Sequence, residues 1–142
     1  MSTNSAAIRV GRLLEIRVDG GYRTLADVDQ VFDAIQREIR KLHKAKHVAV
    51  VDWRRCPLMS PTAAGRVAQR IAQLNAHTQR SAALANHDSP VAVLQFLRVI
   101  RETGLADRKL FFEARELVDW LAGALTDAEL RRLAEFLGEG SS

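Results

Sequence analysis

The chain has 142 residues, of which 47% are hydrophobic and 27% are charged, and its formal net charge is +4. This length suits a single domain that buries its own core, and the composition excludes disordered, collagen-like and coiled-coil chains. No run approaches 18 apolar residues, so we predict no membrane span. Residues 1–7 lack the basic and apolar regions of a signal peptide, so we expect a cytoplasmic protein.

The first half of the chain predicts a hairpin, a helix and a buried strand. Apolar and polar residues alternate over 8–18 and are interrupted by a glycine, which indicates two short strands joined by a tight turn. Apolar residues then recur at steps of three and four over 25–42, as in an amphipathic helix that Thr24 and Asp27 would cap. The continuous apolar run 48–51 is typical of a strand that is buried on both faces.

Two Ser-Pro pairs open the next two helices. Ser60 and Ser89 suit helix N-caps, and the proline after each suits the first helical position. Strands are predicted at 82–85 and 109–112. Two further helices follow, and the last begins at a capping box and carries an apolar stripe. The residues that mark these four helices are Val67, Ile71 and Leu74; Val93, Leu97, Ile100 and Gly104; Leu117, Val118, Leu121 and Leu125; and Thr126, Glu129, Leu130, Leu133 and Phe136.

The order of elements is therefore β-β-α-β-α-β-α-β-α-α. Alternating strands and helices indicate parallel pairing through right-handed crossovers, and the opening hairpin adds an antiparallel pair. We predict an α/β fold with a mixed sheet of about five strands, helices packed around it and an extra C-terminal helix. One domain would span residues 8–137, with flexible segments at 1–7 and 138–142.

Charge and metal-ligand spacing point away from several ligands. Lys and Arg number 21 and Asp and Glu 17, and the two signs alternate along most segments, so we expect a mixed, solvated surface and no nucleic-acid partner. The lone Cys56 excludes a disulfide within the chain. His43 and His47 have helical spacing, but no further ligand follows at a suitable distance along the chain, so we predict neither a metal nor a cofactor.

Several strings resemble STAS domains, the fold of bacterial anti-sigma-factor antagonists. An apolar strand ends in Asp52 and leads through a loop to 60–65, SPTAAG. In STAS domains such a strand and loop lead to a helix that begins Asp-Ser-Ser-Gly. The segment 103–105, TGL, followed by 110–114, LFFEA, is similar to the family's later pattern of Gly-Leu, a strand and an acidic-Ala helix. The resemblance covers about residues 8–125 and implies a regulatory protein-interaction module in bacterial signalling.

The resemblance also implies a phosphorylation switch, which this sequence alters. The family's Asp-Ser-Ser positions fall on Ser60, Pro61 and Thr62, so the usual phosphoacceptor position is a proline without a hydroxyl. Ser60 and Thr62 remain as candidate phosphoacceptors, although an N-cap role alone explains Ser60. We therefore expect constitutive partner binding.

In STAS domains, the loop before this helix and the helix itself form the partner-binding surface. Arg66, Arg70 and His77 have spacings of four and seven, so we expect them near one helix face. Two further arginines in the loop would extend them into a basic patch for an acidic partner or an anionic ligand, and a merely solvated helix face is the alternative. The predicted partner contacts are Trp53, Arg54, Arg55, Ser60, Thr62, Arg66 and Arg70. For Trp53, packing in the core or at an edge of the fold is the alternative.

Two other functions find some support in the residues. His87 and Asp88 follow one strand and Asp52 ends its neighbour, at the edge where α/β sheets often bind ligands, but no Gly-x-Ser-x-Gly elbow accompanies them. We therefore predict that the protein is not an enzyme. Some STAS-like sequences are grouped with lipid-transfer folds, which leaves a small-ligand or lipid-binding protein as the alternative function. The expected partner is an anti-sigma factor or a related kinase, with a second copy of the chain as a further alternative.

Overall fold

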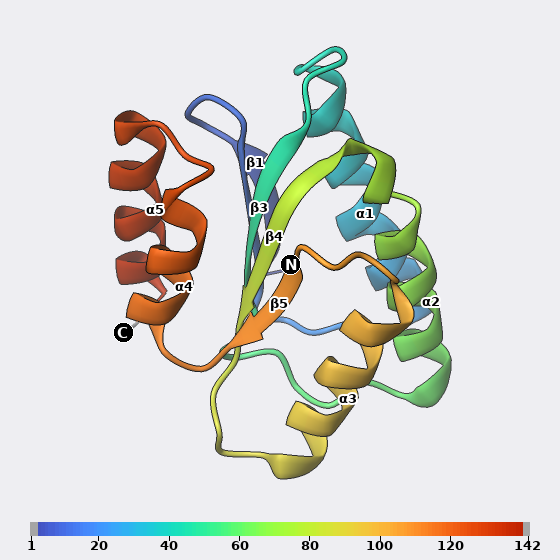
Figure 1. Cartoon of the computed structure of the whole chain (residues 1–142). Helices are drawn as coiled ribbons and strands as arrows, with labels where there is room; N and C mark the ends of the chain where they lie inside the picture. Colours follow the sequence, from blue (N-terminus) through green and yellow to red (C-terminus); the bar gives the residue numbers. More distant parts are fainter. Residues whose placement is uncertain (1–2, 141–142) are drawn as a thin grey trace.

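One mixed sheet of five strands forms the centre of the computed structural model, which describes residues 3–140 (Figure 1). The strands are β1 (Asn4–Ile8), β2 (Leu13–Val18), β3 (His47–Asp52), β4 (Thr78–Leu84) and β5 (Arg108–Phe111). They lie in the order β1-β2-β3-β4-β5, with β1 antiparallel to β2 and all other neighbours parallel. This arrangement confirms the predicted α/β fold with a mixed sheet.

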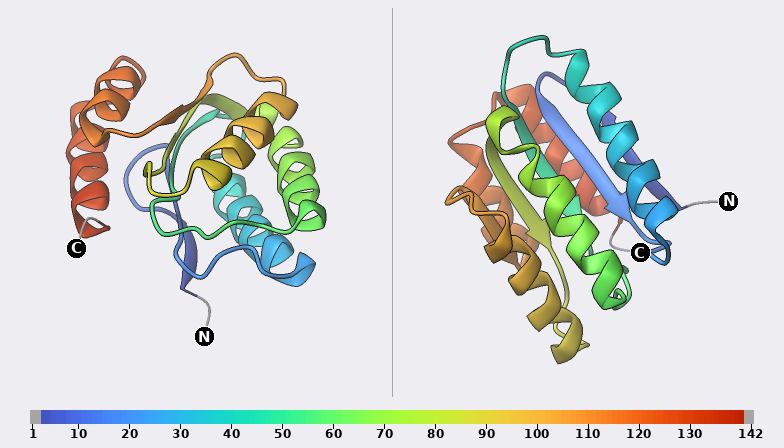
Figure 2. Two further views of the ribbon diagram at one scale, coloured as in Figure 1. Left: turned by 90° about the horizontal axis from the view of Figure 1, so that it is seen from below. Right: turned by 90° about the vertical axis from the view of Figure 1, so that its right-hand side faces the viewer.

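Three helices cover one face of the sheet and two cover the other. They are α1 (Leu25–Arg40), α2 (Pro61–Ala72), α3 (Pro90–Glu102), α4 (Ala114–Ala122) and α5 (Asp127–Glu139). Because the strand order follows the chain order, every right-handed crossover from β2 onward places its helix on the same face, which α1, α2 and α3 occupy. The opposite face is covered by α4 and α5 (Figure 2). None of the helices in the described part of the chain is long and apolar enough to cross a membrane.

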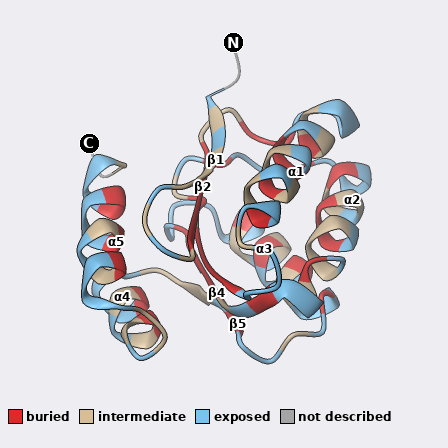
Figure 3. Ribbon diagram, turned by 90° about the horizontal axis from the view of Figure 1, so that it is seen from above, coloured by how far each residue is buried: buried red, intermediate tan, exposed pale blue. Residues whose placement is uncertain are grey.

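The two faces of the sheet bury two hydrophobic cores. Figure 3 shows the buried sides of the helices turned toward the sheet. In β3, Ala49 packs into the core beneath α1–α3, whereas Val48 and Val50 pack into the core beneath α4 and α5. This explains the continuous apolar run in that strand. The second core consists of Leu13, Val48, Val50, Ala82 and Leu84 from the sheet and Leu117, Leu121, Leu133, Phe136 and Leu137 from α4 and α5.

The helix boundaries follow the capping residues. Capping boxes begin α1 at Thr24 and α5 at Thr126, as the sequence predicts. Ser60 and Ser89 cap α2 and α3, and a proline follows each. Gly104 has a φ of 74°, in the left-handed region that favours glycine, and it ends α3. The extra C-terminal helix is confirmed as α5.

The terminal boundaries differ from the prediction. β1 begins at Asn4, so residues 4–7, which were predicted to be flexible, pair with β2. Their side chains are small or polar and carry little hydrophobic signal, so only the backbone ladder reveals the strand. At the other end, α5 extends to Glu139, two residues into the predicted flexible tail. The predictions for residues 1–2 and 141–142 lie outside the described residues.

The connection between α2 and β4 also differs from the prediction. α2 ends at Ala72, and a 3₁₀ turn, η1 (Asn75–His77), follows. His77 therefore does not lie on the face of α2 that carries Arg66 and Arg70. β4 begins at Thr78, four residues earlier than predicted, because its polar first residues pair with β3 and with β5 rather than contributing an apolar run.

Candidate functional site

The carboxyl ends of β3 and β4 and the first turns of α2 and α3 lie at one edge of the sheet. β3 ends at Asp52, and the next amide, that of Trp53, donates to the carbonyl of Leu84 at the end of β4, at 2.8 Å. Two loops leave this edge and enter the Ser-Pro caps of α2 and α3. In parallel α/β sheets this edge commonly carries the binding site.

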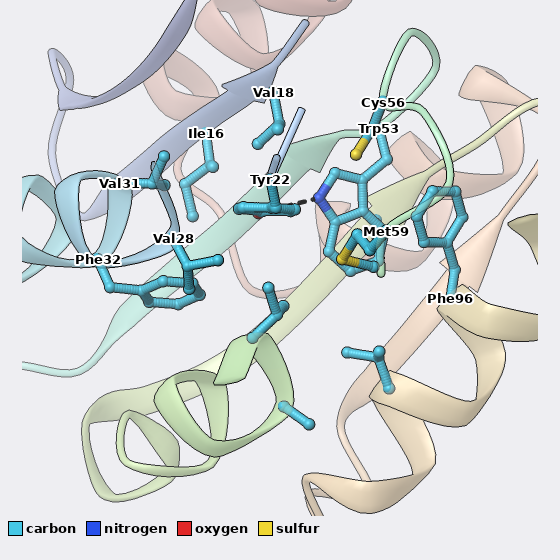
Figure 4. Close-up of a cluster of buried hydrophobic side chains, with 14 of the residues drawn as sticks. Ile16, Val18, Tyr22, Val28, Val31, Phe32, Trp53, Cys56, Met59 and Phe96 are labelled. Carbon is cyan, nitrogen blue, oxygen red and sulfur yellow. Dashed lines mark hydrogen bonds between the residues drawn. The ribbon is translucent and has the colours of Figure 1, made fainter. Parts of the chain in front are cut away.

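Trp53 anchors the first of these loops inside the protein. Its indole Nε1 donates to the Tyr22 hydroxyl at 3.3 Å, and its ring stacks on Phe96 with the centroids 4.8 Å apart (Figure 4). Only 2% of Trp53 is exposed. Trp53 is therefore a core residue that offers little surface to a partner, and its role as a partner contact stays a prediction. Cys56 lies in the same cluster, where burial raises the pKa of its thiol to about 12.

The end of the loop is clamped to α3. The Met59 amide donates to Gln95 Oε1, and Gln95 Nε2 donates to the Met59 carbonyl, both at 2.8 Å. Two hydrogen bonds between the same pair of residues fix both distance and orientation. Leu58, the residue before this clamp, is thereby held beside the N-terminal half of α3.

Three large apolar side chains remain exposed here: Leu58 is 54% exposed, Val91 62% and Leu94 68%. Val91 and Leu94 are three residues apart on α3, so they share a helix face. A groove of about 380 Å³ runs between α2 and α3, and an added Cβ at Gly65 in its wall would meet no atom. The groove is lined by Pro61, Ala64, Gly65, Leu94, Gln95, Arg98, Val99 and Glu102. We refer to the groove together with Leu58, Val91 and Leu94 as the α2–α3 surface.

Arg54 holds the sheet and α5 together. Its Nε and Nη2 donate to the two carboxylate oxygens of Asp52, each at 3.0 Å, and Nη2 also donates to the Leu137 carbonyl at 2.8 Å. Burial alone would raise the pKa of Asp52, but hydrogen bonds from Arg54 and Arg17 outweigh burial and hold this pKa below its ordinary value. Arg54 therefore turns toward the α5 face of the sheet, away from the α2–α3 surface.

Arg66 and Arg70 are neutralised by α1. Arg66 donates from Nε and Nη2 to the two carboxylate oxygens of Asp29, at 3.2 and 3.1 Å. Arg70 donates to Asp29 at 2.8 Å and to Asp33 at 3.0 Å. These hydrogen bonds, that of Arg66 above all, lower the pKa of Asp29. Because their charges are engaged and His77 lies elsewhere, the predicted basic patch does not form.

Ser60 and Thr62 lie at the start of α2, beside the α2–α3 surface, and Arg55 lies in the loop that leads to it. Ser60, Thr62 and Arg55 are all exposed. The Ser60 hydroxyl accepts a hydrogen bond from the Ala63 amide at 3.1 Å, so its oxygen is engaged in the helix cap. Thr62 lies in the first turn of α2. The structure thus places both candidate phosphoacceptors at the N-terminus of the helix that lines the groove.

The residues considered for hydrolysis have structural contacts on different faces of the sheet. Asp52 is engaged by Arg17 and Arg54 on the α5 face. The His87 ring stacks on Phe112, which packs against the core beneath α1–α3, with centroids 4.2 Å apart. Within residues 3–140, no cluster of three or more His, Cys, Asp or Glu side chains has the arrangement of a metal site.

A small apolar cavity lies between the sheet and α1–α3. Its volume is about 40 Å³, which suits a water molecule and is far below the roughly 300–1,000 Å³ of ligand pockets. His47 lines it, and its Nδ1 is buried without a hydrogen-bond partner among residues 3–140. The Thr78 hydroxyl donates to the Leu74 carbonyl and lies 3.1 Å from His47 Nε2, so Nε2 carries the proton. A cavity of this size does not support a lipid-binding function.

Sequence reasoning missed the exposed apolar residues Leu58, Val91 and Leu94. A signal was present in α3, because its apolar residues exceed one helical stripe: Phe96 and Val99 are buried, while Val91 and Leu94 point to solvent. An excess of this kind indicates either a helix buried all round or a surface that is covered by something else.

No protein-family model matches the chain, and no curated protein sequence matches it significantly. Membership of the STAS family therefore stays a prediction.

Proposed function

We propose that this protein is a non-enzymatic protein-interaction module, of the regulatory kind that STAS domains provide in bacterial signalling, and that its partner binds the α2–α3 surface. The observation that carries this proposal is the exposure of Leu94, which lines the groove between α2 and α3, together with that of Val91 one helical turn earlier and of Leu58 in the loop clamped to α3. Exposed apolar side chains beside a groove are characteristic of protein-binding surfaces.

The surface suits a partner helix with an apolar face. Because these three side chains are already partly buried, covering what remains exposed contributes roughly 3–5 kcal/mol before the entropic cost of association is subtracted. Gly65 lets another backbone approach the groove closely, because no side chain projects there. At the far end of the groove, Arg98 and Glu102 form an exposed ion pair that offers both signs of charge to a partner's polar rim.

The same geometry favours binding without a phosphorylation switch. Pro61 occupies the family's usual phosphoacceptor position, and the Ser60 hydroxyl is engaged in the helix cap. Thr62 is exposed and remains the hydroxyl that a kinase would reach most readily. An anti-sigma factor or a related kinase is the expected class of partner, and this expectation rests on the resemblance to STAS domains.

Arg66→Glu/Arg70→Glu is a poor test of this surface, because it would place like charges opposite Asp29 and disrupt the contact between α1 and α2. Val91→Glu/Leu94→Glu changes only exposed side chains. Leu25→Glu is the matched control, because Leu25 is a 42% exposed leucine at the start of α1.

The experiment captures partners from a cell lysate on the immobilised protein and then measures each purified partner by calorimetry. We expect a partner whose affinity falls at least tenfold with the double variant and stays unchanged with Leu25→Glu. A partner that binds all three proteins equally would place the interface elsewhere. Ser60→Asp is expected to bind as the parent does, and loss of binding in a folded Ser60→Asp protein would establish a phosphorylation switch.

A further inference from the structure

The net charge of the chain is concentrated in one short segment. Residues 37–47 contain five Lys and Arg side chains and one Glu, a net charge of +4, which equals that of the whole chain. The rest of the chain therefore carries equal numbers of acidic and basic side chains. Acidic and basic residues alternate along most of the sequence, which is why we expected no nucleic-acid partner, but residues 37–47 depart from this pattern.

The fold places the segment at a projecting end of the molecule. Arg37 and Arg40 lie in the last turn of α1, and the chain then turns into β3 beyond the end of the sheet, beside the hairpin turn between β1 and β2 (Figure 1). Arg12 of that hairpin donates from Nη1 to the Lys46 carbonyl at 2.7 Å, so the two turns are joined. We call the group formed by Arg12, Arg37, Arg40, Lys41, Lys44 and Lys46 the basic end. It lies at the start of β3, whereas the α2–α3 surface lies at the end of β3.

Carboxylates offset only part of the charge of the basic end. Among the described residues, Lys41 forms an ion pair with Glu38 at 2.6 Å, Arg37 also interacts with Glu38, and Arg12 interacts with the buried Glu129. Arg37 and Arg40 interact favourably with the C-terminal dipole of α1, so helix stability accounts for them in part. Lys44 and Lys46 lie in the exposed turn beyond the helix, where neither an ion pair nor a helix end explains them.

The side chains that are missing from the basic end identify the class of partner. The exposed large apolar side chains of the described residues are Leu25, Leu58, Val91, Leu94 and Leu97, and none belongs to this end. Stable membrane anchoring needs an inserted apolar element or lipid chain besides basic residues, and a protein interface needs apolar or aromatic anchors. Single-stranded nucleic acid is held largely by stacking on aromatic rings, which the segment lacks. Duplex phosphates require only exposed cations.

We propose that the basic end binds the phosphate backbone of duplex nucleic acid without reading its sequence. About five phosphate contacts predict a slope of about −4.5 for log K against log salt, which is roughly a 500-fold loss of affinity between 50 and 200 mM salt. A dissociation constant of about 10⁻⁴–10⁻⁶ M is expected at physiological salt. The proposal is independent of partner binding at the α2–α3 surface.

The test compares two variants with the same net charge. Lys44→Glu/Lys46→Glu lowers the charge of the chain from +4 to zero, and so does Arg23→Glu/Arg115→Glu, in which both substituted arginines are exposed and lie outside the basic end. Any effect of overall charge is therefore equal in the two proteins. The binding of labelled duplexes of about 20 base pairs is followed by fluorescence anisotropy over a range of salt concentrations.

We expect Lys44→Glu/Lys46→Glu to weaken binding at least tenfold and to make the salt slope shallower by about 2, while Arg23→Glu/Arg115→Glu retains most of the affinity. Two duplexes of unrelated sequence should bind equally. Equal losses in both variants would overturn the proposal, because they would show a net-charge effect without a site. Binding to vesicles that contain phosphatidylserine but not to duplexes would also overturn it and would identify a membrane surface instead.

Discussion

Replacing Arg132 tests whether a buried ion pair attaches α5 to the sheet. Arg132 donates from Nε and Nη2 to the two carboxylate oxygens of Glu15, at 2.9 and 2.7 Å, and Glu15 is only 1% exposed. Breaking such a pair by removing one partner typically costs 3–5 kcal/mol, because the other charge stays buried. Arg9 still donates to Glu15 at 2.8 Å, so we expect Arg132→Met to lower the free energy of unfolding by about 3 kcal/mol, the bottom of that range.

The assay is urea unfolding followed by circular dichroism, with the denaturant slope checked for constancy. Arg131→Met is the control, because Arg131 is exposed on the same helix and its loss should change stability by less than about 0.5 kcal/mol. The double variant Glu15→Met/Arg132→Met should recover most of the loss, since it leaves no buried carboxylate. If Arg132→Met unfolds at the urea concentration of the parent, the buried pair does not hold α5 in place and this reasoning fails.

Three further predictions concern α5, the buried histidine and the cap of α2. Truncation after Leu125 removes α5 and uncovers the second core, so light scattering should show that the shortened chain aggregates. A truncated chain that is as soluble and as stable as the parent would show that the helix is dispensable. Burial, with Arg108 and His77 nearby, lowers the pKa of His47 to about 4, so below about pH 6.5 the unfolded chain binds more protons than the folded chain. The free energy of unfolding should therefore fall by up to about 3 kcal/mol as the pH drops from about 6.5 to 4. Urea unfolding measured across this pH range should show a smaller fall for His47→Gln. Ser60→Ala should lower the free energy of unfolding by about 1 kcal/mol, and Ser60→Asp should lower it by far less, because aspartate also caps helices. Equal thermal midpoints for the two variants would contradict the claim that the Ser60 side chain stabilises α2 as its N-cap.

Local chemistry was sufficient to predict most of the secondary structure. The capping boxes at Thr24 and Thr126 and the Ser-Pro pair at Ser60 mark helix starts, because the residues that satisfy a helix's free amides are its immediate neighbours in sequence. The apolar run 48–51 similarly indicated a strand covered on both faces, because successive strand residues point to opposite faces and each of these residues is apolar. The order of elements was also sufficient to predict that the candidate site lies at the edge of the sheet between Asp52 and the start of α2.

The chemical state of the candidate site depended on contacts between residues distant in sequence. Arg66 and Arg70 appeared available to a partner until α1 packed Asp29 against them, and Trp53 appeared able to anchor a partner until Tyr22 and Phe96 enclosed it. Charge neutralisation and burial are properties of neighbours in space, which spacing along one helix does not specify.

The exposure of Leu94 and the gathering of basic residues around Lys46 depend on tertiary structure for the same reason. An apolar residue on a helix is buried only if another element covers its face, and the core beneath α1–α3 covers Phe96, whereas Leu94 lies at an open groove. The sequence by itself determined where the helices begin and which strands are buried, because both depend on residues close along the chain. Only the tertiary structure decided which charges remain unpaired and which apolar side chains remain exposed, because both depend on surfaces that meet only after folding.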